Sequence, residues 1–209
     1  MPSNNSLIAE PSAELIAALR ESDPDAQLAI YREYATLIYT VIRRLIGRPA
    51  IADELFQEVF VDILRGIAGY SGAGSFGGWI RSIAVNRCMM YLRSPWHRGV
   101  LWLDALHGGN SHDSDMVERS RADTPQLDAT LNARADLERA FGALPALTRA
   151  VVWLHDVEEY THKEIAQLLH RTPSFSKSQL MRGHARLRQL LDAEIAPTAC
   201  ASTPVVSKS

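Results

Sequence analysis

The sequence predicts an all-α protein in which two small helical domains are joined by a flexible linker. Apolar residues recur at spacings of three and four along most of the chain, and capping residues stand at the ends of these stretches. No segment has the alternating apolar and polar pattern of a half-buried strand. Between the two helical parts, residues 104–128 contain Gly, Ser and Asp but few large apolar side chains, which is typical of a linker.

The first domain, residues 1–98, is expected to contain four helices. Asp23 followed by Pro24 forms an N-cap with proline at the first helical position, and Gly47 is a stop signal. Ser94 and Pro95 end the last helix, because proline disfavours a helical conformation in the residue before it. The expected helices cover residues 12–20, 24–46, 51–67 and 76–93, with a glycine-rich loop at residues 69–75.

The second domain, residues 131–195, follows a linker placed at residues 99–130. Helical periodicity resumes near Leu131 and is broken at Pro145, at residues 159–160 and at residues 171–173. The tail, residues 196–209, is rich in Ser, Thr and Pro and is predicted to be disordered.

The composition is that of a globular protein without a membrane segment. Hydrophobic residues make up 46% of the chain and charged residues 22%. No apolar run approaches the ~20 residues needed to span a bilayer, and no signal-peptide pattern opens the chain, so we expect a cytoplasmic protein without membrane insertion. The net charge of −2 provides no general basic field, and Cys88 and Cys200 form neither a disulfide framework nor a zinc motif.

A helix-turn-helix is predicted near the C-terminus. Thr161 and Glu164 fit a capping box that opens a short helix, and a turn at residues 170–173 leads into a longer helix. Residues 171–189 carry several cations and no Asp or Glu, which favours insertion of this second helix into a DNA major groove over a merely solvated basic face. The residues expected near DNA are Ser174, Phe175, Lys177, Ser178, Met181 and Arg182.

A second stretch without acidic residues, 79–98, interleaves cations with aromatic side chains. This combination suits single-stranded nucleic acid, because bases stack on rings while cations hold the backbone. Trp79, Asn86 and Arg93 recur every seven residues and therefore share a helix face, and asparagine can read a base edge. The alternative is that Trp79 and Tyr91 are core residues.

Three segments resemble the sigma factors of bacterial RNA polymerase, in the order found in that family. Residues 53–60, DELFQEVF, resemble the region 2.2 helix, which binds the clamp helices of the polymerase β′ subunit. Residues 76–93, which begin FGGWIRSIAVNR and end YLR, resemble the segment that reads the minus-ten promoter element. Leu144-Pro145, the VVWLHDVE of residues 151–158 and the helix-turn-helix resemble region 4, which reads the minus-thirty-five element. Housekeeping sigma factors also have regions 1.1 and 3, for which this sequence has no room. The resemblance therefore points to the two-domain extracytoplasmic-function group.

The resemblance implies a subunit that has no catalytic activity, metal or cofactor. Its implied partners are core RNA polymerase (the β′ clamp and the β flap), promoter DNA, and an anti-sigma factor or other negative regulator. The implied polymerase-binding residues are Asp53, Glu54, Leu55, Phe56, Gln57, Glu58 and Phe60. The implied DNA-binding residues of the first domain are Tyr70, Ser71, Ser75, Trp79, Asn86, Arg87 and Arg93, with Asn86 and the loop at 70–75 expected to hold a base flipped out of the stack.

The sequence departs from the family pattern at four positions. Ile51 takes the place of an acidic residue, His170 that of the turn glycine, and Met90 that of an acidic residue before the YLR ending. Ser176 is polar where the family has an apolar residue.

Two other functions compete with this interpretation. A helix-turn-helix regulator that does not bind polymerase would explain the second domain but not residues 53–60 or 79–93. A metal-dependent enzyme using His107, His112, Asp113 and Asp115 is disfavoured, because these residues lack a fixed ligand spacing and lie in a Gly- and Ser-rich stretch.

Overall fold

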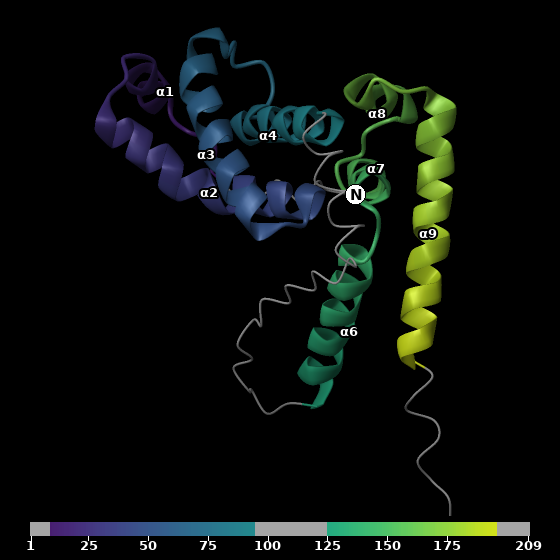
Figure 1. The fold of residues 1–209 in the computed structure, drawn as a ribbon. Coiled ribbons are helices and arrows are strands. Elements are labelled where there is room, and N and C mark those ends of the chain that lie inside the picture. Colours follow the sequence, from purple (N-terminus) through teal and green to yellow (C-terminus); the bar gives the residue numbers. More distant parts are fainter. Residues whose placement is uncertain (1–8, 95–124, 196–209) are drawn as a thin grey trace, which may run out of the picture.

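The computed structural model describes residues 9–94 and 125–195 of the 209-residue chain. Every regular element in these ranges is helical, which confirms the all-α prediction (Figure 1). The elements in chain order are α1 (Ala13–Arg20), α2 (Pro24–Ile46), α3 (Pro49–Gly66), the 3₁₀ turn η1 (Ile67–Gly69), α4 (Phe76–Arg93), α6 (Pro125–Gly142), α7 (Ala146–Asp156), α8 (His162–Leu169) and α9 (Pro173–Ile195). Residues 9–94 are called the N-terminal domain below, and residues 125–195 the C-terminal domain.

In the N-terminal domain, α2, α3 and α4 pack around a core of aliphatic side chains. The Asp23 carboxylate accepts a hydrogen bond from the Ala26 amide at 2.8 Å, and Pro24 opens α2 as expected. Gly47 ends α2 in the left-handed conformation, with φ of 75°. α3 begins at Pro49, two residues before the predicted start, because proline at the first helical position needs no hydrogen-bond partner for its nitrogen.

In the C-terminal domain, α9 packs against α6, α7 and α8. Figure 1 shows α6 and α9 lying side by side. α6 begins at Pro125, so the helix starts inside the stretch that the sequence pattern assigned to the linker. Because residues 95–124 lie outside the described residues, the linker bounds of 99–130 stay a prediction. The metal-site candidates His107, His112, Asp113 and Asp115, and the predicted tail, lie outside the described residues.

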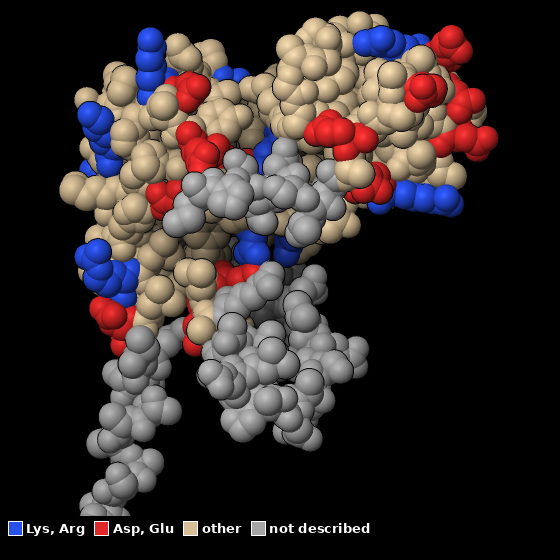
Figure 2. Space-filling model, turned by 180° about the vertical axis from the view of Figure 1, so that it is seen from behind, with Lys and Arg blue, Asp and Glu red and all other residues tan. Residues whose placement is uncertain are grey.

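The two domains contact each other directly. The C-terminal end of α2 packs against α7, and α4 packs against α8, so that one apolar core continues from the N-terminal into the C-terminal domain. In Figure 1, α4 runs out of the N-terminal domain and ends beside α8. The view from behind shows two lobes with positively charged side chains at their junction (Figure 2). None of the described helices combines the length and apolar character needed to cross a bilayer.

Candidate nucleic-acid interfaces

The helix-turn-helix is formed by α8 and α9, and its turn is stabilised by local hydrogen bonds. The Thr161 hydroxyl and the Glu164 side chain complete the predicted capping box at the start of α8. His170 adopts the left-handed conformation, with φ of 51°, in the place of the turn glycine. The amide of Arg171 then donates to the carbonyl of Ala166 at 2.8 Å, and Thr172 Oγ1 accepts from the amide of Phe175 at 3.2 Å. His170 therefore preserves the turn despite its side chain.

The outer face of α9 carries most of the DNA-binding residues predicted in the helix-turn-helix. Ser174, Lys177 and Arg182 are exposed, and Met181 is 68% exposed, which is unusual for so apolar a side chain. Phe175 and Ser178 are half-buried. The guanidinium of Arg171 lies over the Phe175 ring, 5.8 Å from its centroid, so a cation and an aromatic ring stand together at the start of α9.

Two features behind this face were not predicted from the sequence. Ser176 is fully buried, and its hydroxyl shares a hydrogen bond of 3.0 Å with His162 Nδ1. Ser176, which is polar where the family has an apolar residue, thus has a hydrogen-bond partner on α8. Gly183 is buried where α9 crosses α7, and a Cβ there would overlap the side chain of Val152. An isolated glycine within a helix is a recognised signal of close packing, and it could have indicated this contact.

In the N-terminal domain, Trp79 lies within an aromatic cluster at the start of α4. Its ring centroid is 5.1 Å from that of Tyr70 and 5.4 Å from that of Phe76. Phe76 is fully buried and Trp79 half-buried. Part of the Trp79 ring is therefore packed in the core and part is accessible, and its contact with a base stays a prediction. Tyr91 is also half-buried, and its burial raises the pKa of its hydroxyl.

The loop before α4 is held in a defined conformation. Gly72 and Gly74 have φ of 77° and 90°, a region that favours glycine. The Tyr70 hydroxyl donates to the Gly74 carbonyl at 3.1 Å, and the Tyr70 carbonyl accepts from Arg20 Nη2 at 2.7 Å. Ser71 Oγ accepts from the Ala73 amide, while Ser75 Oγ caps α4 by accepting from the Gly78 amide at 3.0 Å. Ser75 is therefore the N-cap of α4, and its contact with DNA stays a prediction.

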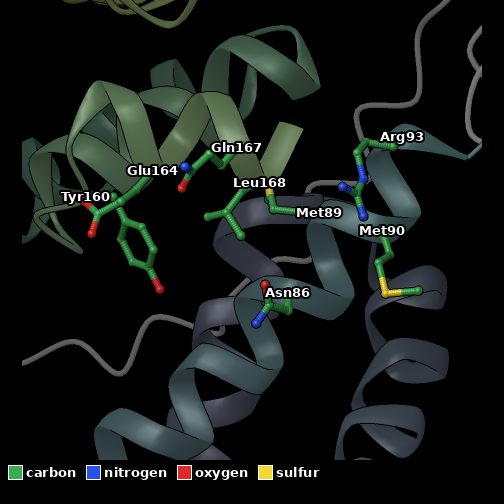
Figure 3. A pocket seen from close by; sticks show the side chains of 8 residues that line it. All are labelled: Asn86, Met89, Met90, Arg93, Tyr160, Glu164, Gln167 and Leu168. Carbon is green, nitrogen blue, oxygen red and sulfur yellow. The ribbon is translucent and has the colours of Figure 1, made fainter. Parts of the chain in front are cut away.

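Asn86 is exposed and lines an open cleft between α4 and α8, of about 450 Å³. Figure 3 shows Tyr160 and Leu168 pointing from the C-terminal domain toward the helix that carries Asn86. The residues that line the cleft are Asn86, Met89, Met90, Arg93, Tyr160, Glu164, Gln167 and Leu168.

Arg87 differs from the other predicted DNA-binding cations because it has acidic partners within its own domain. Its guanidinium pairs with Asp62 and lies 3.4 Å from the carboxylate of Glu58, both on α3. The hydrogen bond to Asp62 raises the pKa of Arg87 above its ordinary value. We infer that Arg87 fixes α4 against α3 and has little freedom left for DNA.

The predicted polymerase-binding residues share α3. Asp53, Glu54, Gln57 and Glu58 are exposed, whereas Leu55 is 5% exposed and belongs to the core. Leu55 therefore packs mainly inside the domain, and its contact with polymerase stays a prediction. Phe56 and Phe60 are half-buried, and their ring centroids lie 5.9 and 5.1 Å from that of Tyr31 of α2. Within the described ranges, no three His, Cys, Asp or Glu side chains are grouped as metal ligands.

Comparisons with known proteins match both domains. Residues 30–98 match Sigma-70 region 2, and residues 134–187 match Sigma-70 region 4. The ECF RNA polymerase sigma factor SigE of Mycolicibacterium smegmatis is 30% identical over 170 residues, which cover 81% of this chain and 63% of that protein. The RNA polymerase sigma factor CarQ of Myxococcus xanthus is 26% identical over 172 residues, which cover 82% of this chain and 92% of that protein.

A similar arrangement of helices occurs in a solved structure, that of the sigma factor RpoE of Bartonella quintana in complex with the anti-sigma factor NepR. The TM-score is 0.51 at 17% identity, over 81% of this chain and 98% of that one, and this likeness concerns the fold alone. The two family matches and the sequence relatives identify the chain. It belongs to the extracytoplasmic-function group of the sigma-70 family, the alternative sigma factors that direct promoter-specific transcription with RNA polymerase.

Proposed function

We propose that this chain docks on core RNA polymerase through α3 and then positions promoter DNA with α9 and α4. The observation that carries the proposal is the surface of α3, where the carboxylates of Asp53, Glu54 and Glu58 are exposed on the same helix as the partly accessible rings of Phe56 and Phe60. Protein interfaces usually combine accessible aromatic side chains with polar and charged ones. A DNA-binding regulator that does not bind polymerase would not need this surface.

Promoter recognition is divided between the domains. α9 would enter the major groove of the minus-thirty-five element with Lys177 and Arg182, because both are exposed near the start of the recognition helix. The loop at residues 70–75, the accessible edge of Trp79 and the amide of Asn86 would capture an unpaired base of the minus-ten element. A base that leaves the stack costs a few kcal/mol, which stacking and base-edge contacts must offset.

The chain would act by binding, without a catalytic centre, a metal or a cofactor, and it would act in the cytoplasm, where the polymerase is. The C-terminal domain would also contact the β flap of the polymerase. The solved relatives of similar fold include sigma factors bound to negative regulators, such as RpoE with the anti-sigma factor NepR. We therefore include an anti-sigma protein among the proposed partners.

The proposal is tested by titrating the labelled full chain with core RNA polymerase. Glu54→Lys should weaken binding by a few kcal/mol, because it places a like charge opposite the basic surface that an acidic helix requires. Glu33→Lys is the matched control, since Glu33 is an exposed carboxylate on α2. Run-off transcription on a genomic promoter library should yield discrete start sites only when the chain is present. A chain that does not bind core polymerase would be a DNA-binding regulator of another kind.

A further inference from the structure

Residues 9–20, called the N-terminal segment below, reach both ends of the loop that precedes α4. Arg20, the last residue of α1, donates from Nη2 to the carbonyl of Tyr70 at 2.7 Å, where the loop begins. Glu10, which lies before α1, accepts through Oε2 a hydrogen bond of 2.8 Å from the amide of Phe76, where α4 begins. In Figure 1, α1 lies beside the end of α3 that leads through η1 into this loop. Two side chains of one segment therefore hold the two ends of the loop.

The carboxylate of Glu10 stands at a helix end that favours a negative charge. The first amides of a helix have no partner within the helix, and the helix dipole stabilises an anion beside them. Ser75 Oγ accepts from the amide of Gly78 at 3.0 Å, so Ser75 and Glu10 cap two different amides of α4. α4 itself has no acidic residue in its first turn. Glu10 thus supplies this charge from 66 positions away in the chain.

The N-terminal segment is anchored to the core of its domain. The hydroxyl of Tyr34, a residue only 1% exposed, donates to the carbonyl of Ala9 at 3.1 Å. Burial raises the pKa of Tyr34 to about 12, so its hydroxyl stays protonated as a donor. Its ring meets that of Phe76 edge to face, with centroids 5.3 Å apart. Ile16 and Leu19 of α1 are buried in the same core. The segment can therefore hold the loop in a fixed position relative to the core.

Between its two fixed ends, the loop borders open space. Gly72 and Gly74 have φ of 77° and 90°, and a Cβ on either residue would meet no atom within 4 Å. At the base of the loop, the ring of Tyr70 lies 5.1 Å from that of Trp79. The loop backbone and the Trp79 ring are the surfaces to which the proposed function assigns the unpaired base. A pocket whose walls are held before binding loses less conformational freedom when the ligand enters.

We propose that Glu10 and Arg20 are positioning residues for base capture, which clamp the loop at residues 70–75 to the core and so set its position beside Trp79. Both act through the backbone, at Tyr70 and Phe76, without touching the base. The match to Sigma-70 region 2 begins at residue 30, so neither residue belongs to the matched segment. The inference rests on the proposed function, because it takes this loop as part of the minus-ten surface.

Hydrogen exchange followed by mass spectrometry on the full chain tests the clamp itself. Glu10→Ala removes the acceptor of the Phe76 amide, and Arg20→Ala removes the donor to the Tyr70 carbonyl. Each should raise amide exchange in residues 70–76 by about threefold to tenfold, the range expected for the loss of one hydrogen bond, while exchange in α2 stays unchanged. Glu10→Gln should keep exchange slow, because its amide oxygen still accepts from Phe76.

Two matched controls separate the clamp from a general effect of charge. Glu21→Ala removes an exposed carboxylate at the end of α1, and Arg32→Ala removes an exposed cation on α2. Neither should change exchange in the loop. Affinity for core polymerase should be the same in every variant, because none of the changes falls on α3.

Base capture is measured by fluorescence anisotropy, with each variant bound to core RNA polymerase. The probe is a fluorescein-labelled non-template strand that carries the minus-ten sequence found by run-off transcription with the unmodified chain. A series of such strands has one base at a time replaced by an abasic site. The unmodified chain should lose most affinity at one position, that of the captured base. In Glu10→Ala and Arg20→Ala this loss should shrink by about threefold to tenfold, whereas Glu10→Gln should retain it.

The outcomes separate the clamp from the proposed function. Full base discrimination in both alanine variants would overturn the inference alone, and so would unchanged exchange in the loop. If the unmodified chain binds every abasic strand equally, base capture by this loop fails and the inference fails with it. Docking of α3 on polymerase is measured separately by the Glu54→Lys titration, and none of these results alters it.

Discussion

Ser176 and His162 form a polar pair behind the recognition helix. The Ser176 hydroxyl is fully buried and lies 3.0 Å from His162 Nδ1. The pair joins the start of α8 to the start of α9, so it sets the position from which Lys177 projects. A buried hydroxyl that loses its partner retains the cost of desolvation, whereas removing both polar groups avoids that cost. The pair therefore yields a prediction that distinguishes a hydrogen bond from simple packing.

His162→Ala should destabilise the chain by about 1–3 kcal/mol in urea denaturation, because it leaves Ser176 Oγ buried and unsatisfied. His162→Ala combined with Ser176→Ala should lose less than the sum of the two single changes. Additive losses would show that the two side chains do not interact. Lys163→Ala is the control, since Lys163 is an exposed neighbour on α8.

The free energy of unfolding should also depend on the protonation of the His162 ring, and therefore on pH. Burial, together with His155 and Lys177, lowers the pKa of His162 below its ordinary value of 6.5. His155 stacks on the ring at 4.7 Å, and Asp156 bridges His155 to His184, at 2.9 and 2.6 Å. The unfolded chain binds the His162 proton more readily than the folded one. The His162 contribution to stability is therefore complete above pH 6.5 and is lost as the pH falls through the lowered pKa.

The measurement is the free energy of unfolding in urea at pH values from about 7.5 down to about 5, the window in which histidine titrates. His162→Gln keeps a polar partner for Ser176 but cannot be protonated, so its curve should fall less steeply on the acid side. His155, Asp156 and His184 remain in both proteins, and the difference between the curves isolates His162. Parallel curves would assign the acid sensitivity to the other groups.

Lys177→Ala and Arg182→Ala should each weaken binding to the upstream promoter element by about 1–3 kcal/mol if they contact base edges. Both side chains are exposed on the outer face of α9, near its start. Affinity for core polymerase should not change, because the outer face of α9 is proposed to contact DNA and not the polymerase. DNase footprinting of the polymerase complex at the upstream element provides the measurement.

Arg188→Ala is the matched control, since Arg188 is an exposed cation two turns further along the same helix. It should alter the salt dependence of binding without changing base preference, because a phosphate contact carries no sequence information. Normal upstream protection by both the Lys177 and Arg182 variants would contradict the placement of α9 in the groove.

Local signals made much of the fold predictable. The capping box at Thr161, the proline after Asp23 and the left-handed Gly47 are determined by residues within one turn of each other, and the structure has all three. The exposed cations of α9 were likewise predictable, because helical periodicity separates them from the apolar stripe.

Contacts between distant residues were not predictable in this way. The sequence pattern around Arg149 is that of an ordinary helix cation. In the structure Arg149 is buried, and its guanidinium donates to the carbonyl of Ile46, 103 residues away. Arg87 was expected at DNA, but Asp62 pairs with it from 25 residues away. No local pattern encodes such a pairing, and the contact between the two domains depends on pairings of this kind. The burial of Leu55, by contrast, follows from helical spacing, because Val59 and Ile63 lie on the same helix face and are buried with it.

Asn86→Ala should impair promoter opening while the initial closed complex with double-stranded DNA persists. Asn86 is exposed on α4 and shares a helix face with Trp79, so its amide can reach a base that stacks on that ring. Deleting residues 72–74 should have the same effect, because Gly72 and Gly74 let the loop backbone approach a flipped base closely. Permanganate footprinting of unpaired thymines reports opening, and gel mobility reports the closed complex.

Gln27→Ala is the control for Asn86, since Gln27 is an amide side chain on α2 that donates to the Ser22 carbonyl at 3.2 Å, remote from α4's cleft. The alternative is that Asn86 is only a helix surface residue and the loop only a connection. Under that alternative, both variants open a matched promoter at the normal rate and keep the same base preference. The base-capture pocket would then lie elsewhere on the N-terminal domain, and the assignment of α4 would rest on the stacking surface of Trp79 alone.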